Sequence, residues 1–506
     1  MRAAAAPPSR GGSSGGRNRA RGGLNLGLWT CSGAAAACGT GLLAAAAAGL
    51  ADGASAAALS ILGGVCAGAG GLGLRRLRPP RHPTARVTFA AACSAWSVMI
   101  AVSTAAYLAA GATASLPDAV LESISGFCTT GISVLEGLES LPAGVLLWRA
   151  ITQWLGGLAA LILLAAALPL HAPGLVLPGD GGAVPGRSSI PDFGTQVRRL
   201  ATVYGTVTLV CAAAYAAAGM GALDAFSYAF TTVSTGGFGN HADGLGHFDS
   251  AAVEAVATIF MAIAGISAMT LWWVVRGRFE VLSRSFEFRT YALVLGAGIA
   301  ALTAWTYSGA GAADLRRGAF AAAATMSSTG FEAPGWSGWP WGAQVLAVAL
   351  IATGAMAATA GGGFQMPRAI AAARYAYREL VVEIHPQTVH VVKIGRHSVS
   401  ERSLALLNGY QILFAVAMVG GAFTLSLAGR GLWEAAAASV SALATMGPAP
   451  GVDLGALGGL ERGVLAALML LGRLALYPLV VAAVGVAAGA RRRVAADRAD
   501  GRRTVR

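Results

Sequence analysis

Long apolar segments recur along this chain of 506 residues, and they restrict its possible folds more than any other feature. An apolar stretch of about 20 residues with few charges is long enough to span a lipid bilayer as an α-helix. The chain is 55% apolar and 12% charged, whereas soluble domains carry about 25% charged residues. We therefore expect an all-α polytopic membrane protein whose main partner is the lipid bilayer.

The net charge of +13 is distributed in a way that argues against nucleic-acid binding. Thirty of the 36 Lys and Arg residues lie in short segments that alternate with acidic loops. Basic loops stay on the cytoplasmic side of a membrane protein, so we expect both termini to be cytoplasmic and residues 136–141 and 243–249 to be external. Acidic outer loops would concentrate cations at the mouth of a pathway. The basic segments are 1–26, 75–86, 187–199, 276–289, 368–402 and 491–506.

Signatures of enzymes and of bound metals or cofactors are missing from the sequence. The six cysteines form no CxxC motif, which argues against a disulfide framework or a zinc site. No HExxH motif occurs, and GxSxG spacing occurs only in the Gly- and Ser-rich N-terminal segment at residues 11–16. The apolar segments contain no convergent set of His, Asp, Glu and Ser. We therefore expect no enzyme activity and no cofactor. Gly64 and Gly68 have GxxxG spacing, which predicts close packing of the segment 54–74 against another helix.

A unit of about 90–115 residues occurs four times from residue 87 onward. Each unit has a long apolar segment, a shorter amphiphilic segment, a polar segment around a glycine, and a second long apolar segment. We call the polar segments the glycine loops, and Gly131, Gly237, Gly330 and Gly447 their central glycines. The loops are FCTTGIS (127–133), VSTGGFG (233–239), MSSTGFE (326–332) and ATMGPAP (444–450), and the flanking apolar segments are 87–110 and 142–170, 200–222 and 250–275, 290–310 and 341–360, and 403–428 and 460–488.

The amphiphilic segment before each glycine loop is too short to span a membrane, and an acidic residue marks its start in three units. Asp118, Asp224 and Glu434 each lie 13 residues before the central glycine. An acidic side chain stabilises the positive end of a helix and can cap it. In the third unit this position is Arg317, with Asp314 three residues earlier, so its register is open.

Each glycine loop has the pattern of a pore loop, in which a short helix enters the membrane, an extended segment follows, and a full helix completes the span. A surface turn is the alternative for any single loop, but four copies in matching context favour pore loops around one axis. Non-helical backbone at membrane depth must be buried in protein or line water, and rings of carbonyl oxygens can replace the hydration shell of a cation. Whether the second loop uses Gly236 or Gly237 stays open. The expected ion-binding residues are Thr129, Thr130, Gly131, Thr235, Gly236, Gly237, Ser328, Thr329, Gly330, Thr445, Met446 and Gly447.

The expected architecture is four tandem membrane–pore-loop–membrane repeats around one pore, preceded by an extra helix pair. This amounts to about ten membrane helices plus four pore helices. The expected boundaries are a disordered basic N-terminus at 1–25, the helix pair at 26–86, repeats at 87–186, 187–289 and 290–366, a basic cytoplasmic linker at 367–402, a fourth repeat at 403–490, and a basic cytoplasmic tail at 491–506.

The combination of motifs resembles the TrkH/KtrB membrane subunits of the Trk/Ktr/HKT superfamily over about residues 26–490, and the extra helix pair is closer to the TrkH type. The resemblance implies potassium uptake across a bacterial inner membrane, a homodimer, and cytosolic nucleotide-binding regulatory subunits of the TrkA/KtrA type. In related eukaryotic transporters, a serine in place of the first filter glycine accompanies sodium selectivity, so Gly131 implies potassium. The motifs are TTG (129–131), TQWLGGLA (152–159), STGGF (234–238), SSTGF (327–331), TAGGGFQMPR (359–368), RELVVEIHP (378–386) and LLGRL (470–474).

Three positions depart from the family pattern. Gln365 stands where the family usually has lysine, and Ala475 stands where it usually has an acidic residue. The third position is the fourth loop, where Met446 and Pro448 flank the central glycine. These departures affect the expected regulation, dimer contacts and symmetry of the filter.

Two features are candidates for a gate. Arg473 lies about 13 residues into the segment 460–488, where a charge costs about 2.5–3.5 kcal/mol. The resemblance implies a pore-facing arginine that restrains cation flow, and a buried ion pair is the alternative. For the segment 354–364, with Gly361, Gly362 and Gly363, the resemblance implies an intramembrane loop that closes the pore. Its alternative is a close-packed helix interface.

Other functions also fit parts of this pattern. A sodium- or proton-coupled potassium symporter of the same family would share the filter, because broken helices also build carriers. A membrane-embedded enzyme lacks the residues that it would need, and a purely structural scaffold would leave four polar loops at membrane depth without a role.

Overall fold

The computed structural model describes residues 12–79, 84–171, 193–333, 336–385, 387, 391–394, 397–399, 401–452 and 457–474. This part of the chain is helical apart from loops and one antiparallel hairpin of the two-residue strands β1 (Lys393–Ile394) and β2 (His397–Ser398). The expectation of an all-α fold is therefore confirmed. Ala475 and the tail at 491–506 lie outside the described residues, as do residues 1–11 and the end of the segment 460–488.

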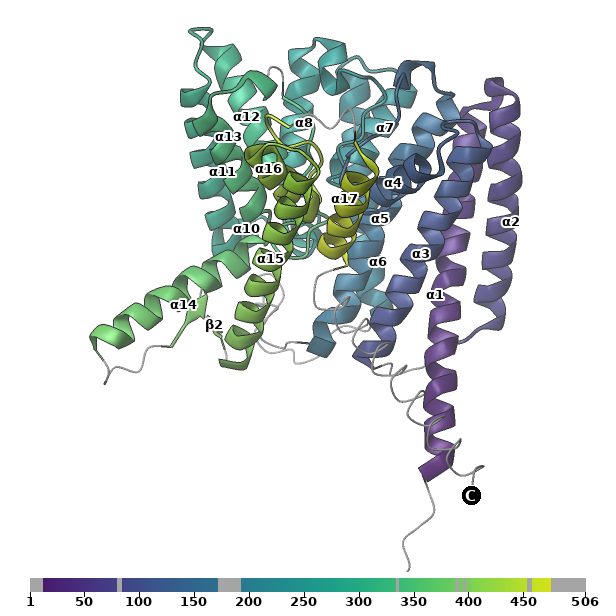
Figure 1. The fold of residues 1–506 in the computed structure, drawn as a ribbon, viewed down its shortest axis with the longest axis horizontal. Helices are drawn as coiled ribbons and strands as arrows, with labels where there is room; N and C mark the ends of the chain where they lie inside the picture. Colours follow the sequence, from purple (N-terminus) through teal and green to yellow (C-terminus); the bar gives the residue numbers. More distant parts are fainter. Residues whose placement is uncertain are drawn as a thin grey trace, which may run out of the picture.

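The N-terminal helix pair consists of α1 (Gly12–Ala48) and α2 (Ala54–Arg76), which lie side by side at one edge of the bundle (Figure 1). The helix α1 begins at Gly12, within the segment 1–25 for which the sequence predicts disorder, and that domain boundary stays a prediction. A helix extends at little cost once a membrane span has nucleated it. The predicted close packing of the segment 54–74 against another helix is confirmed, but Gly64 and Gly68 take no part in it, since no atom lies within 4 Å of a Cβ built at either.

Other glycines mediate the packing of this pair. A Cβ built at Gly70 would lie within 3.0 Å of backbone atoms of α1, and one built at Gly39 within 3.0 Å of backbone atoms of α2. The two backbones therefore approach each other closely at small residues, as in other membrane helix pairs. A spacing motif alone does not say which face of a helix meets its neighbour.

After this pair, a long helix, a short helix and a further helical segment follow one another four times. The order along the chain is α3 (Ala85–Ala109), α4 (Leu116–Phe127) and α5 (Ala143–His171), then α6 (Phe193–Ala217), α7 (Ala222–Val233), α8 (Ala251–Ala264), α9 (Ala268–Val275) and α10 (Glu280–Arg284), then α11 (Phe286–Trp305), α12 (Ala312–Met326), α13 (Trp341–Thr353) and α14 (Met366–Ile384), and last α15 (Glu401–Leu427), α16 (Leu432–Leu443) and α17 (Gly459–Arg473). Short 3₁₀ turns lie at η1 (Leu50–Asp52), η2 (Leu138–Ser140), η3 (Gly244–Phe248) and η4 (Trp336–Gly338).

Two of the expected continuous helices are broken. The segment 250–275 forms α8 and α9, which are bent by 110° at Gly265–Ser267. The segment 341–360 is helical only to Thr353 because residues 354–365 leave the helix. Within the basic linker, α14 covers Met366–Ile384 and extends from the bundle (Figure 1). These breaks put non-helical backbone inside the bundle, where neighbouring helices satisfy it.

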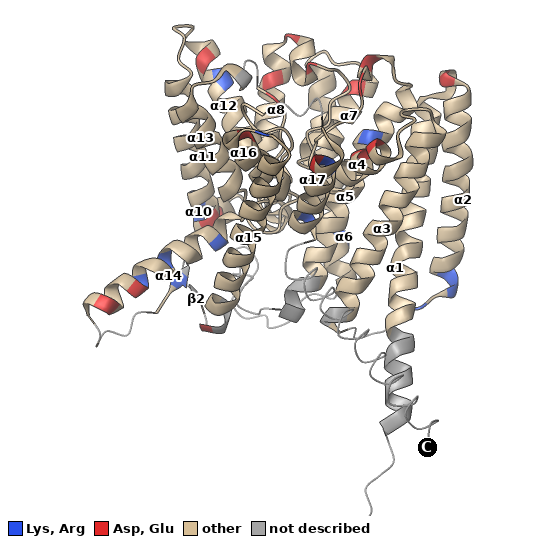
Figure 2. Cartoon of the chain, in the orientation of Figure 1, with Lys and Arg blue, Asp and Glu red and all other residues tan. Residues whose placement is uncertain are grey.

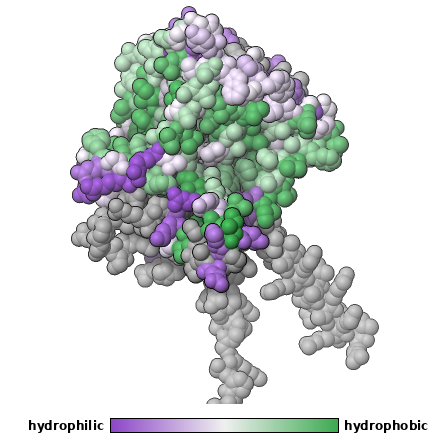
Figure 3. Space-filling model, turned by 90° about the vertical axis from the view of Figure 1, so that its left-hand side faces the viewer, coloured by the Kyte–Doolittle hydropathy of each residue, from purple (hydrophilic) through white to green (hydrophobic). Residues whose placement is uncertain are grey.

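The described helices and the surface fit a membrane environment. Seven described helices are long and apolar enough to span a bilayer, or eight if α8 and α9 together form one span. Acidic residues predominate at the upper end of the bundle in Figure 2, and basic residues gather at the lower end around α14 and the end of α2. Apolar residues cover the middle of the face in Figure 3. The chain is therefore a multi-pass membrane protein, and the full set of about ten membrane helices stays a prediction.

The four short helices α4, α7, α12 and α16 lie in the interior of the bundle. Their second halves are buried almost completely, for example Phe320–Met326 in α12 and Ala437–Leu443 in α16. Small residues predominate in both stretches, which allows neighbouring backbones to approach closely. The C-terminal ends of these helices carry the glycine loops into the centre of the molecule.

Candidate functional site

All four glycine loops begin with the same hydrogen-bonded turn. In the first loop the N–H of Thr129 donates to the carbonyl of Gly126 at 2.9 Å, and the N–H of Thr130 donates to that of Ser125 at 2.9 Å. The same two bonds recur at equivalent positions in the other loops. This pair is the Schellman motif, which ends a helix with a residue in the left-handed conformation. The equivalent donors are Thr235 and Gly236, Ser328 and Thr329, and Thr445 and Met446.

The backbone dihedral angles repeat with the same four-fold pattern. The residue two positions before each central glycine has a positive φ, from 50° at Thr129 to 57° at Thr235 and Ser328. The central glycines themselves have φ from 77° to 102°. Left-handed conformations at two positions, separated by one residue, turn the chain out of the helix in the same way each time. The four loops are therefore one structural unit repeated, although their sequences differ.

The four loops meet in a closed ring. A Cβ built at Gly131 would come within 3.0 Å of the carbonyl oxygen of Gly236, which precedes the central glycine of the next loop. The same contact joins each loop to the next and the fourth loop back to the first. No side chain fits at any of these positions. The remaining contacts run from Gly237 to Thr329, from Gly330 to Met446, and from Gly447 to Thr130.

The ring resolves the open register of the second loop and identifies the asymmetry of the fourth. Gly237 occupies the central position, while Gly236 supplies the carbonyl that faces Gly131. The fourth loop has the same dihedral pattern despite Pro448 and Met446. It differs because the Ser441 hydroxyl donates a hydrogen bond to the Gly447 carbonyl. The expected asymmetry thus lies in a side-chain contact and not in the backbone path.

A glutamine that the motif analysis did not single out clamps the second loop. Gln153 lies on α5 and is fully buried. Its Nε2 donates to the Gly236 carbonyl at 2.7 Å, and its Oε1 accepts from the N–H of Phe238 at 3.1 Å. The amide therefore holds the backbone on both sides of Gly237. A side chain of the first repeat fixes the loop of the second.

A buried ion pair also joins the first two repeats. Arg149 donates from Nε to the Glu122 carboxylate at 2.8 Å, and the two side chains are 1% and 0% exposed. Glu122 also accepts from the N–H of Val134, while Arg149 donates from Nη1 to the Gly239 carbonyl and lies over the Phe238 ring. Removing one member of a buried pair costs about 3–5 kcal/mol. Charged residues inside apolar segments were a usable signal for this pair, because such residues are costly there.

The segment 354–364 is non-helical and lies directly against two glycine loops. The N–H of Gly362 donates to the Ser328 hydroxyl at 3.0 Å. A Cβ at Gly361 would lie 2.7 Å from the Ser327 carbonyl oxygen. One at Gly362 would meet the Ala444 carbonyl oxygen within 3.0 Å. The helix-interface alternative is therefore wrong, because no helix continues through this segment.

Bonds from the second and third repeats hold the same segment. The N–H of Ala268 donates to the Ala358 carbonyl at 3.0 Å, and the N–H of Met356 to the Gly265 carbonyl at 3.1 Å. Both donor–acceptor pairs lie at the bend between α8 and α9. Glu287 accepts from the N–H of Ala357 at 2.6 Å. Gln365 ends the segment as the residue before α14, with φ of 68°.

Arg473 is buried and bonds backbone carbonyls instead of an acidic side chain. Its Nη1 donates to the carbonyl of Ala360 at 2.5 Å, and its Nη2 to that of Gly156 at 3.0 Å. Its Nε has no hydrogen-bond partner within the described part of the chain. No ion pair of Arg473 occurs among the described residues, so the ion-pair alternative finds no support there. The guanidinium links α17, α5 and the segment 354–364.

The acidic residues at the starts of the short helices occupy equivalent places. Each short helix has an acidic side chain as its third residue, namely Asp118, Asp224, Asp314 and Glu434. The third unit fits this rule because α12 begins three residues further from its central glycine than the other short helices do. None of them is the capping residue. The caps are Ser115, Gly221, Gly311 and Gly431.

Asp314 resolves the register of the third unit. Hydrogen bonds from the Ser308 hydroxyl and from backbone N–H groups, with Arg317 nearby, hold the pKa of the Asp314 carboxyl below its ordinary value. This carboxylate is therefore ionised at neutral pH. Asp314 therefore takes the place in the third unit that Asp118 and Asp224 take in the first two.

The structure brings together all the residues predicted from sequence that it describes. The twelve predicted ion-binding residues form the ring, and Gly361 and Gly362 lie against it. Gly363 belongs to the same segment, and Arg473 bonds that segment at Ala360. The hydroxyl-bearing and methionine side chains of the ring are fully buried. Their roles in ion binding and gating stay predictions at this point.

Comparison with known proteins identifies the family. The TrkH family, described as "Cation transport protein", matches residues 66–290 and 308–488. The "Trk system potassium uptake protein TrkH" of Halomonas elongata is 33% identical over 433 residues, which are 81% of this chain and 88% of that protein. The protein of the same name from Escherichia coli K12 is 29% identical over 381 residues, 72% of this chain and 78% of that protein.

A solved structure matches the fold over most of its length. The crystal structure of the potassium transporter TrkH from Vibrio parahaemolyticus superposes with a TM-score of 0.81 and 25% identity, covering 90% of this chain and 98% of that one. The matched family is one of transporters, which confirms the prediction that the chain is not an enzyme. On the family match, the relatives and the shared fold, the chain belongs to the TrkH family of cation transport proteins.

Proposed function

We propose that the chain takes up potassium ions across the bacterial inner membrane through the ring of the four glycine loops. The closed ring of contacts between each central glycine and the carbonyl of the next loop carries this proposal. Such a ring encloses one narrow axis that backbone oxygens surround. The relatives bear the name Trk system potassium uptake protein, which favours potassium among the cations.

The chemistry of the ring suits a dehydrated monovalent cation. Backbone carbonyls can take the place of the hydration shell of an ion, and glycine allows the dihedral angles that this needs. The four short helices end at Phe127, Val233, Met326 and Leu443, immediately before the loops. The negative ends of their dipoles therefore point towards the ring. All four central positions are glycine, including Gly131, whose replacement by serine implies sodium selectivity in related transporters.

The segment 354–364 and Arg473 act together as the gate. The segment contacts the Ser328 hydroxyl on one side and the Arg473 guanidinium on the other. A positive charge beside a narrow pathway raises the electrostatic energy of a cation that passes it, the more so where water is scarce. Breaking the Arg473–Ala360 contact would remove one of the bonds that hold the segment and free the charge to move. Opening therefore requires both parts to shift.

Partners on the cytoplasmic side would supply that shift. The basic end of the bundle faces the cytoplasm by the charge rule, which puts α14 on the side of cytosolic regulatory subunits of the TrkA/KtrA type. Helix α14 follows the 354–364 segment directly and exposes Tyr377, Leu380 and Ile384. A force on α14 would reach the gate through Gln365. A homodimer is the expected assembly in the membrane.

The test is rubidium uptake by proteoliposomes that contain the chain alone, with potassium, sodium or lithium as competitors. The Arg473→Ala variant is measured beside the wild type, because a closed gate would also prevent uptake. Competition by potassium alone is the expected result. Equal competition by sodium and lithium, or no uptake by either protein above empty vesicles, would refute the proposal. Uptake that needs a sodium or proton gradient would make the protein a symporter.

A further inference from the structure

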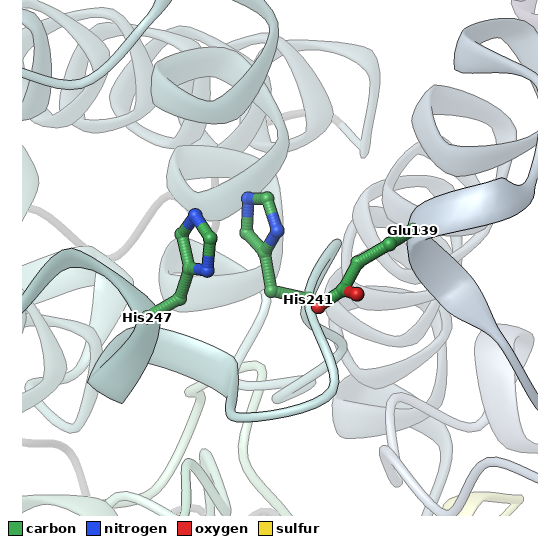
Figure 4. Close-up of side chains that lie close together, drawn as sticks. All are labelled: Glu139, His241 and His247. Atoms are coloured by element: carbon green, nitrogen blue, oxygen red, sulfur yellow. The ribbon is translucent and has the colours of Figure 1, made fainter.

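Two histidines and a glutamate from different repeats meet at the acidic end of the bundle. Glu139 lies in η2, after the first glycine loop. After the second loop, His241 lies just before η3 and His247 lies within it. One ligand atom of each residue lies within 4.8 Å of the others. Figure 4 shows the two imidazole rings side by side and the Glu139 side chain approaching from the neighbouring segment. The rings are stacked with centroids 3.7 Å apart and planes 3° apart.

The ring nitrogens of His241 point to a missing ligand. Both nitrogens are buried from solvent, and neither has a hydrogen-bond partner among the residues that the structure describes. Buried polar atoms nearly always have a partner, and an unpaired one calls for an unobserved water or ion. A second acidic group lies beside His241, since Oδ1 of Asp224 is 3.5 Å from its Nε2. The surroundings are thus electronegative, which favours a cation.

The same surroundings hold the histidines in place. Asp224 accepts a hydrogen bond from the Asn240 amide at 2.8 Å. The Tyr228 hydroxyl donates to the Gly244 carbonyl at 3.0 Å, within the turn that connects the two histidines. Phe248 packs edge-on against both imidazole rings. Supporting contacts of this kind orient metal ligands in proteins.

We propose that Glu139, His241 and His247 bind a divalent transition-metal ion, of which zinc is the type, at the outer mouth of the pathway. Two imidazoles and one carboxylate form a common set of three protein ligands for zinc, with a fourth position open to water. Imidazole also suits copper and nickel, whereas calcium and magnesium prefer oxygen ligands. Small rotations of the exposed Glu139 and His247 side chains would bring the three ligand atoms to one ion.

The bound ion would tie the first repeat to the second close to the ring. His241 lies four residues after Gly237, and Glu139 lies eight residues after Gly131. A divalent cation there adds positive charge where the acidic loops otherwise attract potassium. It also restrains the segments that leave two of the four glycine loops. External zinc should therefore slow potassium uptake. This effect rests on the proposed function, whereas the binding of the metal does not depend on it.

The binding test uses the full-length chain, purified without a polyhistidine tag and titrated with zinc by calorimetry. The variants are His241→Ala, His247→Ala and Glu139→Gln, and His385→Ala at the opposite end of the molecule is the matched control. We expect one zinc ion per chain in the wild type. Loss of either histidine ligand should weaken binding by at least about tenfold, and the control should bind as the wild type does.

Two results would overturn the binding site. One is the absence of saturable binding in a correctly folded wild type, judged by its elution as a single peak on gel filtration. The other is unchanged affinity when both histidines are replaced together. Cobalt gives a second readout, since its visible absorption bands should show imidazole coordination in the wild type and lose intensity in His247→Ala.

Rubidium uptake then tests the effect on transport, with inhibition expressed relative to the zinc-free rate of each variant. External zinc should inhibit the wild type and the His385→Ala control, and inhibit His247→Ala only at concentrations at least about tenfold higher. Zinc binding without inhibition would refute the effect on flux and leave the site in place. Absence of rubidium uptake in zinc-free wild type and Arg473→Ala would instead refute the proposed function, and binding would be judged from calorimetry alone.

Discussion

Replacing Gly131 by serine tests the ring most directly, and the chain offers a matched control. Gly131 has φ of 91°, and Gly309 has φ of 87°. Nothing lies within 4 Å of a Cβ built at Gly309, whereas one at Gly131 would collide with the Gly236 carbonyl oxygen. Both substitutions therefore carry the same backbone strain, and only Gly131→Ser also displaces the neighbouring loop.

The magnitudes separate the two effects. A residue other than glycine in the left-handed region costs about 1–2 kcal/mol, so both variants should lose about this much stability from backbone strain. In the ring, the displaced Gly236 carbonyl would also lose its place beside the ion. A contact between a dipole and a charge is comparable to a hydrogen bond to a charged group, about 1.5–3 kcal/mol. Since about 1.4 kcal/mol is a factor of ten, discrimination between potassium and sodium should fall about tenfold or more in Gly131→Ser.

The assay is rubidium uptake by proteoliposomes with increasing sodium, normalised to the amount of reconstituted protein. Gly131→Ser should admit sodium as a strong competitor, and Gly309→Ser should keep the wild-type ratio. Retention of the wild-type ratio by Gly131→Ser would show that this position is not part of the filter. An equal loss of selectivity in Gly309→Ser would show that backbone strain, and not the ring contact, causes the effect.

Three further predictions follow from single contacts. Arg473→Ala should raise potassium flux, because it removes a positive charge beside the proposed pathway. The amount of protein should stay normal, because no acidic partner among the described residues is left unpaired. Lost expression or unchanged flux would contradict this prediction. Glu122→Gln should lower the free energy of unfolding by about 3–5 kcal/mol. The control is Glu280→Gln, which breaks an ion pair with Arg284 in which both side chains are 77% exposed. This change should lower the free energy of unfolding by at most about 0.5 kcal/mol, and thermal unfolding compares the two variants. Cysteines at exposed positions Glu139 and Asp243, in a chain without native cysteines, should react with an impermeant thiol reagent from outside only.

The four-fold pattern of the site could be predicted because it depends on local sequence. Each glycine loop follows its short helix at the same distance, and the Schellman turn needs only a few adjacent residues. The acidic positions follow the same logic. Asp314 looked displaced only because α12 is 15 residues long and the other short helices are 12. One additional helical turn at the start moves the acidic residue without moving the loop.

The contacts that hold the ring were beyond prediction because they join distant parts of the chain. Gln153 lies 83 residues from the carbonyl that it bonds, and Arg473 lies 317 residues from Gly156. The bend at Gly265–Ser267 contains no helix-breaking proline from which it could be predicted. Backbone hydrogen bonds to the segment 354–364 stabilise it instead. The Glu139–His241–His247 cluster likewise exists only once two repeats are side by side. Local patterns identify elements, whereas these features depend on which elements meet.

A hydroxyl side chain occupies the strained left-handed position of every glycine loop, and this choice has a physical reason. Glycine would avoid a cost of about 1–2 kcal/mol at each position, so the side chain contributes something that glycine lacks. The Thr129 and Thr445 hydroxyls are buried and have no hydrogen-bond partner in the described part of the chain. The Ser328 hydroxyl instead accepts the N–H of Gly362. The Thr445 hydroxyl also lies beside this segment, since a Cβ built at Gly362 would come within 3.0 Å of it. On the proposed function, the first loop would offer its oxygen to the ion, while the third and fourth loops would present theirs to the gate segment. Ion binding and gate movement would then act on the same backbone turns, so a shift of the segment 354–364 would change the geometry of the filter.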